Sequence, residues 1–199
     1  IEAENAPFSQ LPLADVSRLV IALEEQATQA HSPFAFGDVF HFDGQPAVSA
    51  FLASANHLRD AGSLLDWIPE LIHPAIRFDG IDDGQRATLN IYVDDSAGGF
   101  TNQPTLIETI AAVVSRLIRI IAPGSDVFSR LQLAHPARRG PADYEQYFGC
   151  PVEFGGKANR FILNSHALDN ILPGSLPPAH AQAEQTIRLK LVGDGMAPP

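Results

Sequence analysis

Histidines and paired acids are the residues of this chain that could build a catalytic or metal site. The seven histidines are scattered, no two lie at the i, i+4 spacing that places two ligands on one helix face, and only one cysteine is present. The acid pairs Asp82-Asp83 and Asp94-Asp95 flank stretches of alternating residues, where such acids commonly support turns. The sequence therefore predicts no metal site, and we expect no cofactor.

Motifs of nucleophilic catalysis and of nucleotide binding are absent from the sequence as well. No serine stands in a Gly-x-Ser-x-Gly motif. The pairs Gly98-Gly99 and Gly155-Gly156 lack the spacing of a phosphate-binding loop. We therefore predict that the chain has no catalytic residue and is not an enzyme.

Aromatic residues with a few polar neighbours fit a small-molecule pocket better, because such pockets are mostly apolar and use few polar groups for orientation. Trp67 stands among leucines, so a role as a core anchor is the alternative. Arg77 lies between apolar neighbours in an alternating stretch; if buried it needs a carboxylate or a ligand anion, and a solvent-facing strand position is its alternative. The predicted ligand-binding residues are Phe36, Phe40, Phe51, His57, Trp67, Arg77 and Tyr92.

Apolar periodicity predicts that helices dominate the first third of the chain. A helix is expected to begin at Pro12 and to end at Ser32-Pro33, and the aromatic segment 34–44 is interpreted as a loop or short strand. Further helices are expected from Pro46 and over 58–72, the latter bent at Pro69.

The pattern then alternates, which is typical of strands. Residues 76–79 and 89–93 around the turn at 82–85 predict a β-hairpin. The remaining expected elements are strands at 127–133 and 160–163, a short extended piece at 152–154, and helices at 105–122, 141–148 and 177–191. The β-β-α-β-α-β-α order after the first helices predicts an α+β fold with a largely antiparallel sheet.

Two of these helices have informative faces. The helix at 105–122 is apolar nearly all round, so it is either a central core helix or a core helix with one flank in a dimer interface. The last helix is expected to bury a face that carries Ala181, Glu184, Ile187, Arg188 and Leu191.

Bulk composition narrows the class of protein. A chain of 199 residues is long enough for one domain with a sizeable core. Its formal net charge of −10 argues against direct contact with phosphate backbones, which depends on Lys and Arg clusters. One cysteine allows no internal disulfide and fits a reducing compartment, and no apolar run is long enough to span a membrane.

The segment from Tyr144 to Gly156 is the densest pattern in the chain. Tyr144, Tyr147 and Phe148 lie at helical spacing and share one face of a short helix. Gly149 suits a left-handed helix end, and Pro151 starts an extended segment. We interpret the segment as a packing device, with Cys150 as a small buried residue.

These residues also carry a family pattern. It consists of His135-Pro136, Tyr144, Phe148-Gly149-Cys150-Pro151-Val152, Phe154-Gly155, Asn159, Phe161-Ile162-Leu163, Leu168 and Ile171-Leu172-Pro173. From about Pro12 to Gln185 the chain resembles the amino-terminal effector-binding, arabinose-binding-domain-like domain of AraC/XylS-type transcription regulators. Ile171 departs from the pattern, because the family prefers proline there.

The resemblance implies the ligand-sensing and dimerising half of a bacterial, cytoplasmic transcription factor. Residues 1–192 are expected to form this single domain, and 193–199 to begin a linker to a helix-turn-helix domain that contacts DNA. The expected partners are a small-molecule effector, a second copy of the chain and, through the missing domain, DNA, but no membrane. An interaction module without a small ligand is the alternative.

Overall fold

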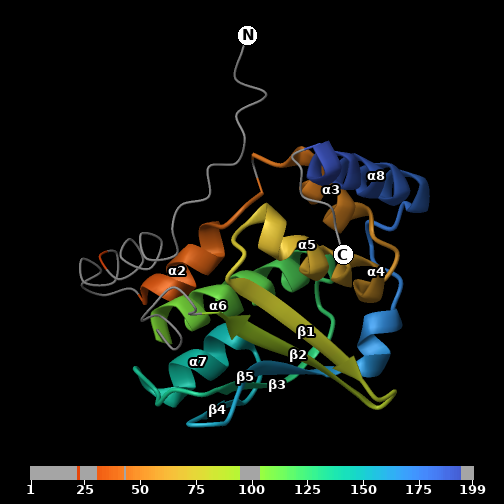
Figure 1. Cartoon of the computed structure of the whole chain (residues 1–199). Helices are drawn as coiled ribbons and strands as arrows, with labels where there is room; N and C mark the ends of the chain where they lie inside the picture. The colour runs from red at the N-terminus through yellow and green to blue at the C-terminus, as the bar shows by residue number, and fades with distance from the viewer. Residues whose placement is uncertain (1–21, 23–30, 43, 95–103, 194–199) are drawn as a thin grey trace.

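Four short helices precede the first strand in the computed structural model, which describes residues 22, 31–42, 44–94 and 104–193 (Figure 1). They are α2 (Ser32–Val39), α3 (Pro46–Ser54), α4 (Leu58–Gly62) and α5 (Leu64–Leu71). Pro33 and Pro46 stand in the first turns of α2 and α3, where the missing N–H of proline costs nothing. The helix expected from Pro12 lies outside the described residues.

The strands of the described residues form one sheet in the order β1-β2-β5-β3-β4. They are β1 (Ile76–Asp82), β2 (Arg86–Val93), β3 (Phe128–Leu133), β4 (Val152–Phe154) and β5 (Asn159–Asn164). All neighbours are antiparallel except β3 and β4, which run parallel. The predicted α+β fold with a largely antiparallel sheet is confirmed.

The β1–β2 hairpin confirms the turn predicted at residues 82–85. Gly84 has a φ of 86°, which favours glycine, and the Asp83 carboxylate accepts hydrogen bonds from the backbone N–H groups of Gln85 and Arg86. Pairing of Asp82 with Ala87 extends β1 to the turn, so Asp82 ends a strand.

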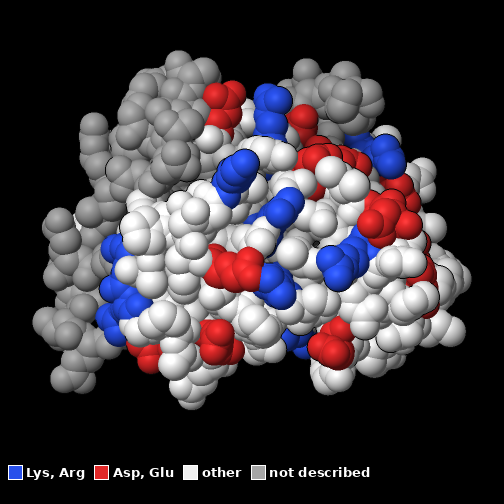
Figure 2. Space-filling view, turned by 90° about the horizontal axis from the view of Figure 1, so that it is seen from below, with Lys and Arg blue, Asp and Glu red and all other residues white. Residues whose placement is uncertain are grey.

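One face of the sheet is covered by helices and the other is open. Ala87, Leu89 and Ile91 on β2 are buried, whereas Tyr92 is exposed, as is its pairing partner Arg77 on β1. This alternation is the ordinary period of a strand with one wet face. Figure 2 views the molecule from below relative to Figure 1, and on this face acidic and basic side chains lie side by side.

The later helices complete the helical part of the fold. The elements are α6 (Pro104–Ile121), α7 (Pro141–Phe148), the 3-10 helix η1 (Ser165–Asp169) and α8 (Pro177–Gly193). α6 contacts α2 on one side and β2 on another, α5 lies against β1, and α8 packs on α3 at the end of the molecule farthest from α7 (Figure 1). The helices expected at 105–122, 141–148 and 177–191 are confirmed, whereas η1 was not anticipated.

The segment after Ser32-Pro33 was predicted wrongly. Residues 32–39 form α2 instead of a loop or short strand, and Pro33 stands in the first turn of that helix. Long-range packing explains the error: Phe34 stacks on Tyr147 with ring centroids 4.0 Å apart. A Cβ at Gly37 would lie 2.6 Å from both Ala112 Cβ and the Tyr147 hydroxyl, so the glycine permits close approach of α2 and α6.

Two helical details also differ from expectation. The helix predicted over 58–72 is interrupted after Gly62, where α4 ends and α5 begins, and Pro69 lies inside α5. The buried side chains of α8 are Ala183, Ile187 and Leu191, while Ala181 is exposed, because α3 sits against a face rotated from the predicted one.

Candidate ligand cavity and its charged rim

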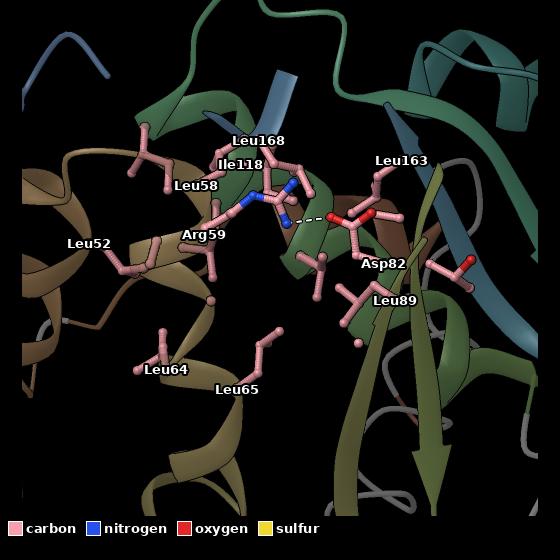
Figure 3. Close-up of a pocket in the computed structure, with 18 of the residues that line it drawn as sticks. Leu52, Leu58, Arg59, Leu64, Leu65, Asp82, Leu89, Ile118, Leu163 and Leu168 are labelled. Carbon is pink, nitrogen blue, oxygen red and sulfur yellow. Dashed lines mark hydrogen bonds and ion pairs between the residues drawn. The ribbon is translucent and has the colours of Figure 1, made fainter. Parts of the chain in front are cut away.

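A cavity of about 340 Å³ lies between the helical layer and the hairpin end of the sheet. Helices α4 and α5 form one wall, and the second half of α6 forms the floor (Figure 3). The sheet contributes β1, β2 and β5. Most lining side chains are aliphatic: Leu52, Leu58, Leu64, Leu65, Leu89, Val114, Leu117, Ile118, Ile121, Leu163 and Leu168. An apolar cavity of this size falls in the range of small-molecule sites.

Arg59 and Asp82 face each other across the rim of the cavity (Figure 3). Arg59 stands in the first turn of α4 and Asp82 ends β1, so their ion pair joins the helical wall to the sheet. The guanidinium also donates from Nε to Asp169 Oδ1 at 2.6 Å and from Nη2 to Ser165 Oγ at 3.0 Å. Three separate elements therefore meet at one arginine.

The rim carboxylates are held in their charged form. A hydrogen bond from the Gly84 backbone N–H, followed by those from Arg59 and Ser165, lowers the pKa of Asp82. The hydrogen bond from Arg59 likewise lowers the pKa of Asp169, and the two carboxylates raise the pKa of Arg59 in return. All three groups are charged at neutral pH.

Two glycines leave room in the cavity. Gly62 ends α4 and Gly80 lies in β1 on the same face as Asp82, and a Cβ built on either one would meet no atom within 4 Å. Neither has a positive φ, so a side chain can be added there without backbone strain. These positions are suited to blocking the cavity by substitution.

A second polar group, which we call the Glu108 cluster, lies around the first half of α6. Glu108 is fully buried; its Oε2 is 2.7 Å from His31 Nε2 and its Oε1 accepts the Tyr144 hydroxyl proton at 2.8 Å. Arg138 Nη1 and His135 Nε2 each lie 3.5 Å from the carboxylate. Burial first, and then Glu108, raise the pKa of Tyr144. Several partners therefore compensate the buried carboxylate.

The segment read as a packing device behaves as one. Tyr144 and Phe148 are buried, and Gly149 ends α7 with a φ of 68°. Cys150 is a free, buried thiol, and burial raises its pKa to about 11. Its tyrosines contact Glu108 and α2, whereas none of its residues lines the cavity described above.

The predicted ligand-binding residues are dispersed, and none of them lines that cavity. Phe36 lies in α2 and Phe40 directly follows that helix, with their ring centroids 6.0 Å apart. Phe51 and Trp67 are buried against each other between α3 and α5, and the Arg188 guanidinium of α8 lies over the Trp67 ring. The core-anchor alternative given for Trp67 agrees with this packing.

The polar candidates lie in two further places. Arg77 and Tyr92 are cross-strand partners on the exposed face of the hairpin, which is the solvent-facing alternative. His57 is half-buried and caps α4, its backbone N–H donating to the Asp60 carboxylate at 3.2 Å. Contact of these residues with a ligand stays a prediction.

Sequence reasoning missed Arg59 and assigned Asp82 to turn chemistry. The two are 23 residues apart, and Asp169 is 110 residues from Arg59, so no local spacing connects them. The sequence held one weak indication of a role for Asp82: it ends a predicted strand, and one face of that strand must pack against a helix.

In the described residues no three His, Cys, Asp or Glu side chains converge as metal ligands. Over the same part of the chain, no helix combines the length and apolar character needed to cross a membrane.

A mostly apolar cavity between a sheet and helices, with an ion pair at its rim, is typical of small-molecule-binding domains. The family model described as the arabinose-binding domain of AraC transcription regulators, N-terminal, matches residues 2–172. The chain belongs to this family of regulatory ligand-binding domains.

The transcriptional regulator CdpR from Pseudomonas aeruginosa has a similar fold, with a TM-score of 0.66 and 16% sequence identity. The alignment covers 87% of this chain and 56% of that chain, so the present chain spans little more than half of the larger regulator. A comparison with curated proteins found no match.

Proposed function

We propose that this chain is the effector-sensing and dimerising half of a bacterial, cytoplasmic AraC-type transcription factor. A small molecule enters the cavity between α4, α5, α6 and the hairpin, and its binding biases a DNA-binding domain attached in the intact regulator. The family assignment supports the regulatory role, and the acidic charge of the chain fits a half that does not itself grip DNA.

The observation that carries the proposal is an apolar space bounded by elements that are tied together mainly at its rim. Arg59 links α4 to β1 and η1, while the walls behind it are aliphatic. A ligand that fits one spacing of wall and sheet better than another shifts the population toward that spacing. Such a shift in population would couple ligand binding in the cavity to the conformation of a distant domain.

The alternative is an interaction module without a small ligand, and α8 offers a specific reason for it. Leu189 and Val192 are 65% and 59% exposed on the side of α8 that faces away from α3. Dimerisation is testable by light scattering of the chain and of a Leu189→Glu variant. A strict monomer at high concentration contradicts dimerisation, whereas dissociation of a dimer by the substitution places the interface on α8 rather than on a flank of α6.

The sensing role is tested by thermal-shift screening of metabolites with a variant that fills the cavity. Gly80→Val adds a side chain where nothing lies within 4 Å, and valine favours strands. Asp79→Val places the same side chain one residue earlier, on the exposed face, and serves as the matched control.

We expect at least one class of amino acid, fatty acid, sugar or aromatic metabolite to raise the melting temperature of the native chain and of Asp79→Val. Gly80→Val should abolish that rise while remaining folded. If a compound still stabilises Gly80→Val, the binding site lies outside this cavity. If no compound stabilises the native chain, the interaction module without a small ligand is the better explanation.

A further inference from the structure

The hydrogen-bonding capacity of Arg59 is largely occupied. Its Nε donates to Asp169, its Nη1 to Asp82, and its Nη2 lies within hydrogen-bond distance of Ser165 Oγ at 3.0 Å and Asp169 Oδ2 at 3.2 Å. A guanidinium has five N–H donors, so these contacts use up to four of them. Among the described residues that line the cavity, Arg59 is the sole cation.

An anionic ligand therefore finds few free donors on Arg59, and it would have to displace a bound carboxylate to form a bidentate ion pair. Arg59 and its two acidic partners together carry a net charge of −1 at neutral pH. Asp83 and Arg86, in the hairpin turn beside Asp82, carry opposite charges and leave this balance unchanged. The rim repels a carboxylate or phosphate and attracts a cation.

The same rim keeps an acceptor for a donor group on the ligand. The Asp82 carboxylate receives hydrogen bonds from the Gly84 backbone N–H at 2.8 Å, from Arg59, and from Ser165 Oγ, which lies 3.0 Å from both carboxylate oxygens. Ser165 has one hydroxyl proton, so these three donors leave one of about four lone-pair positions. A hydroxyl or amine located at the mouth of the cavity fits that position.

We propose that the effector is an apolar molecule with an uncharged hydroxyl or a cationic amine at one end, and that it carries no negative charge. This inference rests on the cavity being the effector site, as proposed above. The aliphatic walls take the apolar body, and Asp82 receives the donor group. The Arg59 ion pairs act as a filter against anions of the same shape.

The test uses three probes with the same eight-carbon chain and different ends: 1-octanol, n-octylamine and octanoate. Their dissociation constants are measured at pH 7 by isothermal titration calorimetry. We expect octanol and octylamine to bind at least about tenfold more tightly than octanoate, because one unit charge near such a rim is worth on the order of tenfold. Gly80→Val should weaken all of them.

Asp82→Asn tests the effect of charge on selectivity separately from the binding of the apolar body. It retains an oxygen acceptor for Arg59 and removes one negative charge, so the preference for octylamine over octanoate should fall by about tenfold. Octanol, which carries no charge, should change least. Asp143→Asn on α7, an exposed position outside the cavity, changes the net charge equally and should leave the preference unchanged.

Tightest binding of octanoate, equal binding of all three probes, or no binding of any would overturn the inference about ligand class. Those results leave the proposed function to its own test, because the metabolite screen with Gly80→Val does not depend on the end group. A preference for amine or alcohol that Asp82→Asn leaves intact would also contradict the role of the rim.

Discussion

The first half of α6 is enclosed by polar and aromatic side chains, whereas its second half lies beside the cavity. Around Glu108 the carboxylate has partners from the residue before α2, from the loop after β3 and from α7. Beside Leu117, Ile118 and Ile121 the neighbours are aliphatic, and the space between them is not filled.

The two halves of α6 therefore have different roles: the first half holds the fold together, and the second half lines the candidate binding site. A satisfied buried polar network specifies one arrangement, because each partner must return to its hydrogen-bonding position. Aliphatic walls impose no such geometry and tolerate small displacements. We therefore expect changes around Glu108 to affect folding, and changes around the cavity to affect binding with little effect on folding.

The largest effect is expected from Glu108→Ala. It leaves His31, Tyr144 and Arg138 without their shared carboxylate in a buried region, which should lower the free energy of unfolding by about 3–5 kcal/mol. Urea denaturation measures the change. Glu108→Gln keeps the shape and one acceptor and should lose less. A loss under about 1 kcal/mol for Glu108→Ala would remove the distinction between the two halves.

A pair of helical glycines gives the next comparison. Gly37→Ala drives a methyl group against Ala112 and Tyr147, which should cost about 1–3 kcal/mol of stability. Gly62→Ala, at the cavity, meets nothing within 4 Å and should be neutral or stabilise by up to about 1 kcal/mol, because alanine favours helix. Thermal unfolding of the two variants is the measurement, and equal effects would contradict the difference in packing.

The smallest effect is expected from Arg59→Met at the exposed rim, where the arginine is 39% exposed. Because Arg59 helps to depress the folded-state pKa of Asp82 and Asp169, its contribution to stability is present above the unfolded pKa of aspartate and is lost as the pH falls through the folded values.

The stability difference between native chain and Arg59→Met should thus be largest near neutral pH and shrink from about pH 5 toward about pH 3. Urea titrations at several pH values follow it. A difference that grows on acidification would show that the methionine acts through packing instead of charge.

Local patterns predicted most of the elements that surround both halves of α6. The Asp-Asp-Gly-Gln turn indicated the hairpin, and apolar periodicity indicated α6, because both depend on neighbours within a few residues. The end of α7 at Gly149 was predicted for the same reason. α2 was missed because its helical state depends on Phe34 meeting Tyr147, 113 residues away in the chain.

The sequence by itself determined the α+β order of elements, the family and the packing role of the segment from Tyr144 to Gly156. Only the tertiary structure decided where the cavity lies, that Arg59 is shared by Asp82 and Asp169, and that Glu108 is buried among four partners. The physical reason is distance along the chain: a period or a turn is set by adjacent residues, whereas a cavity and an ion pair arise where remote elements pack.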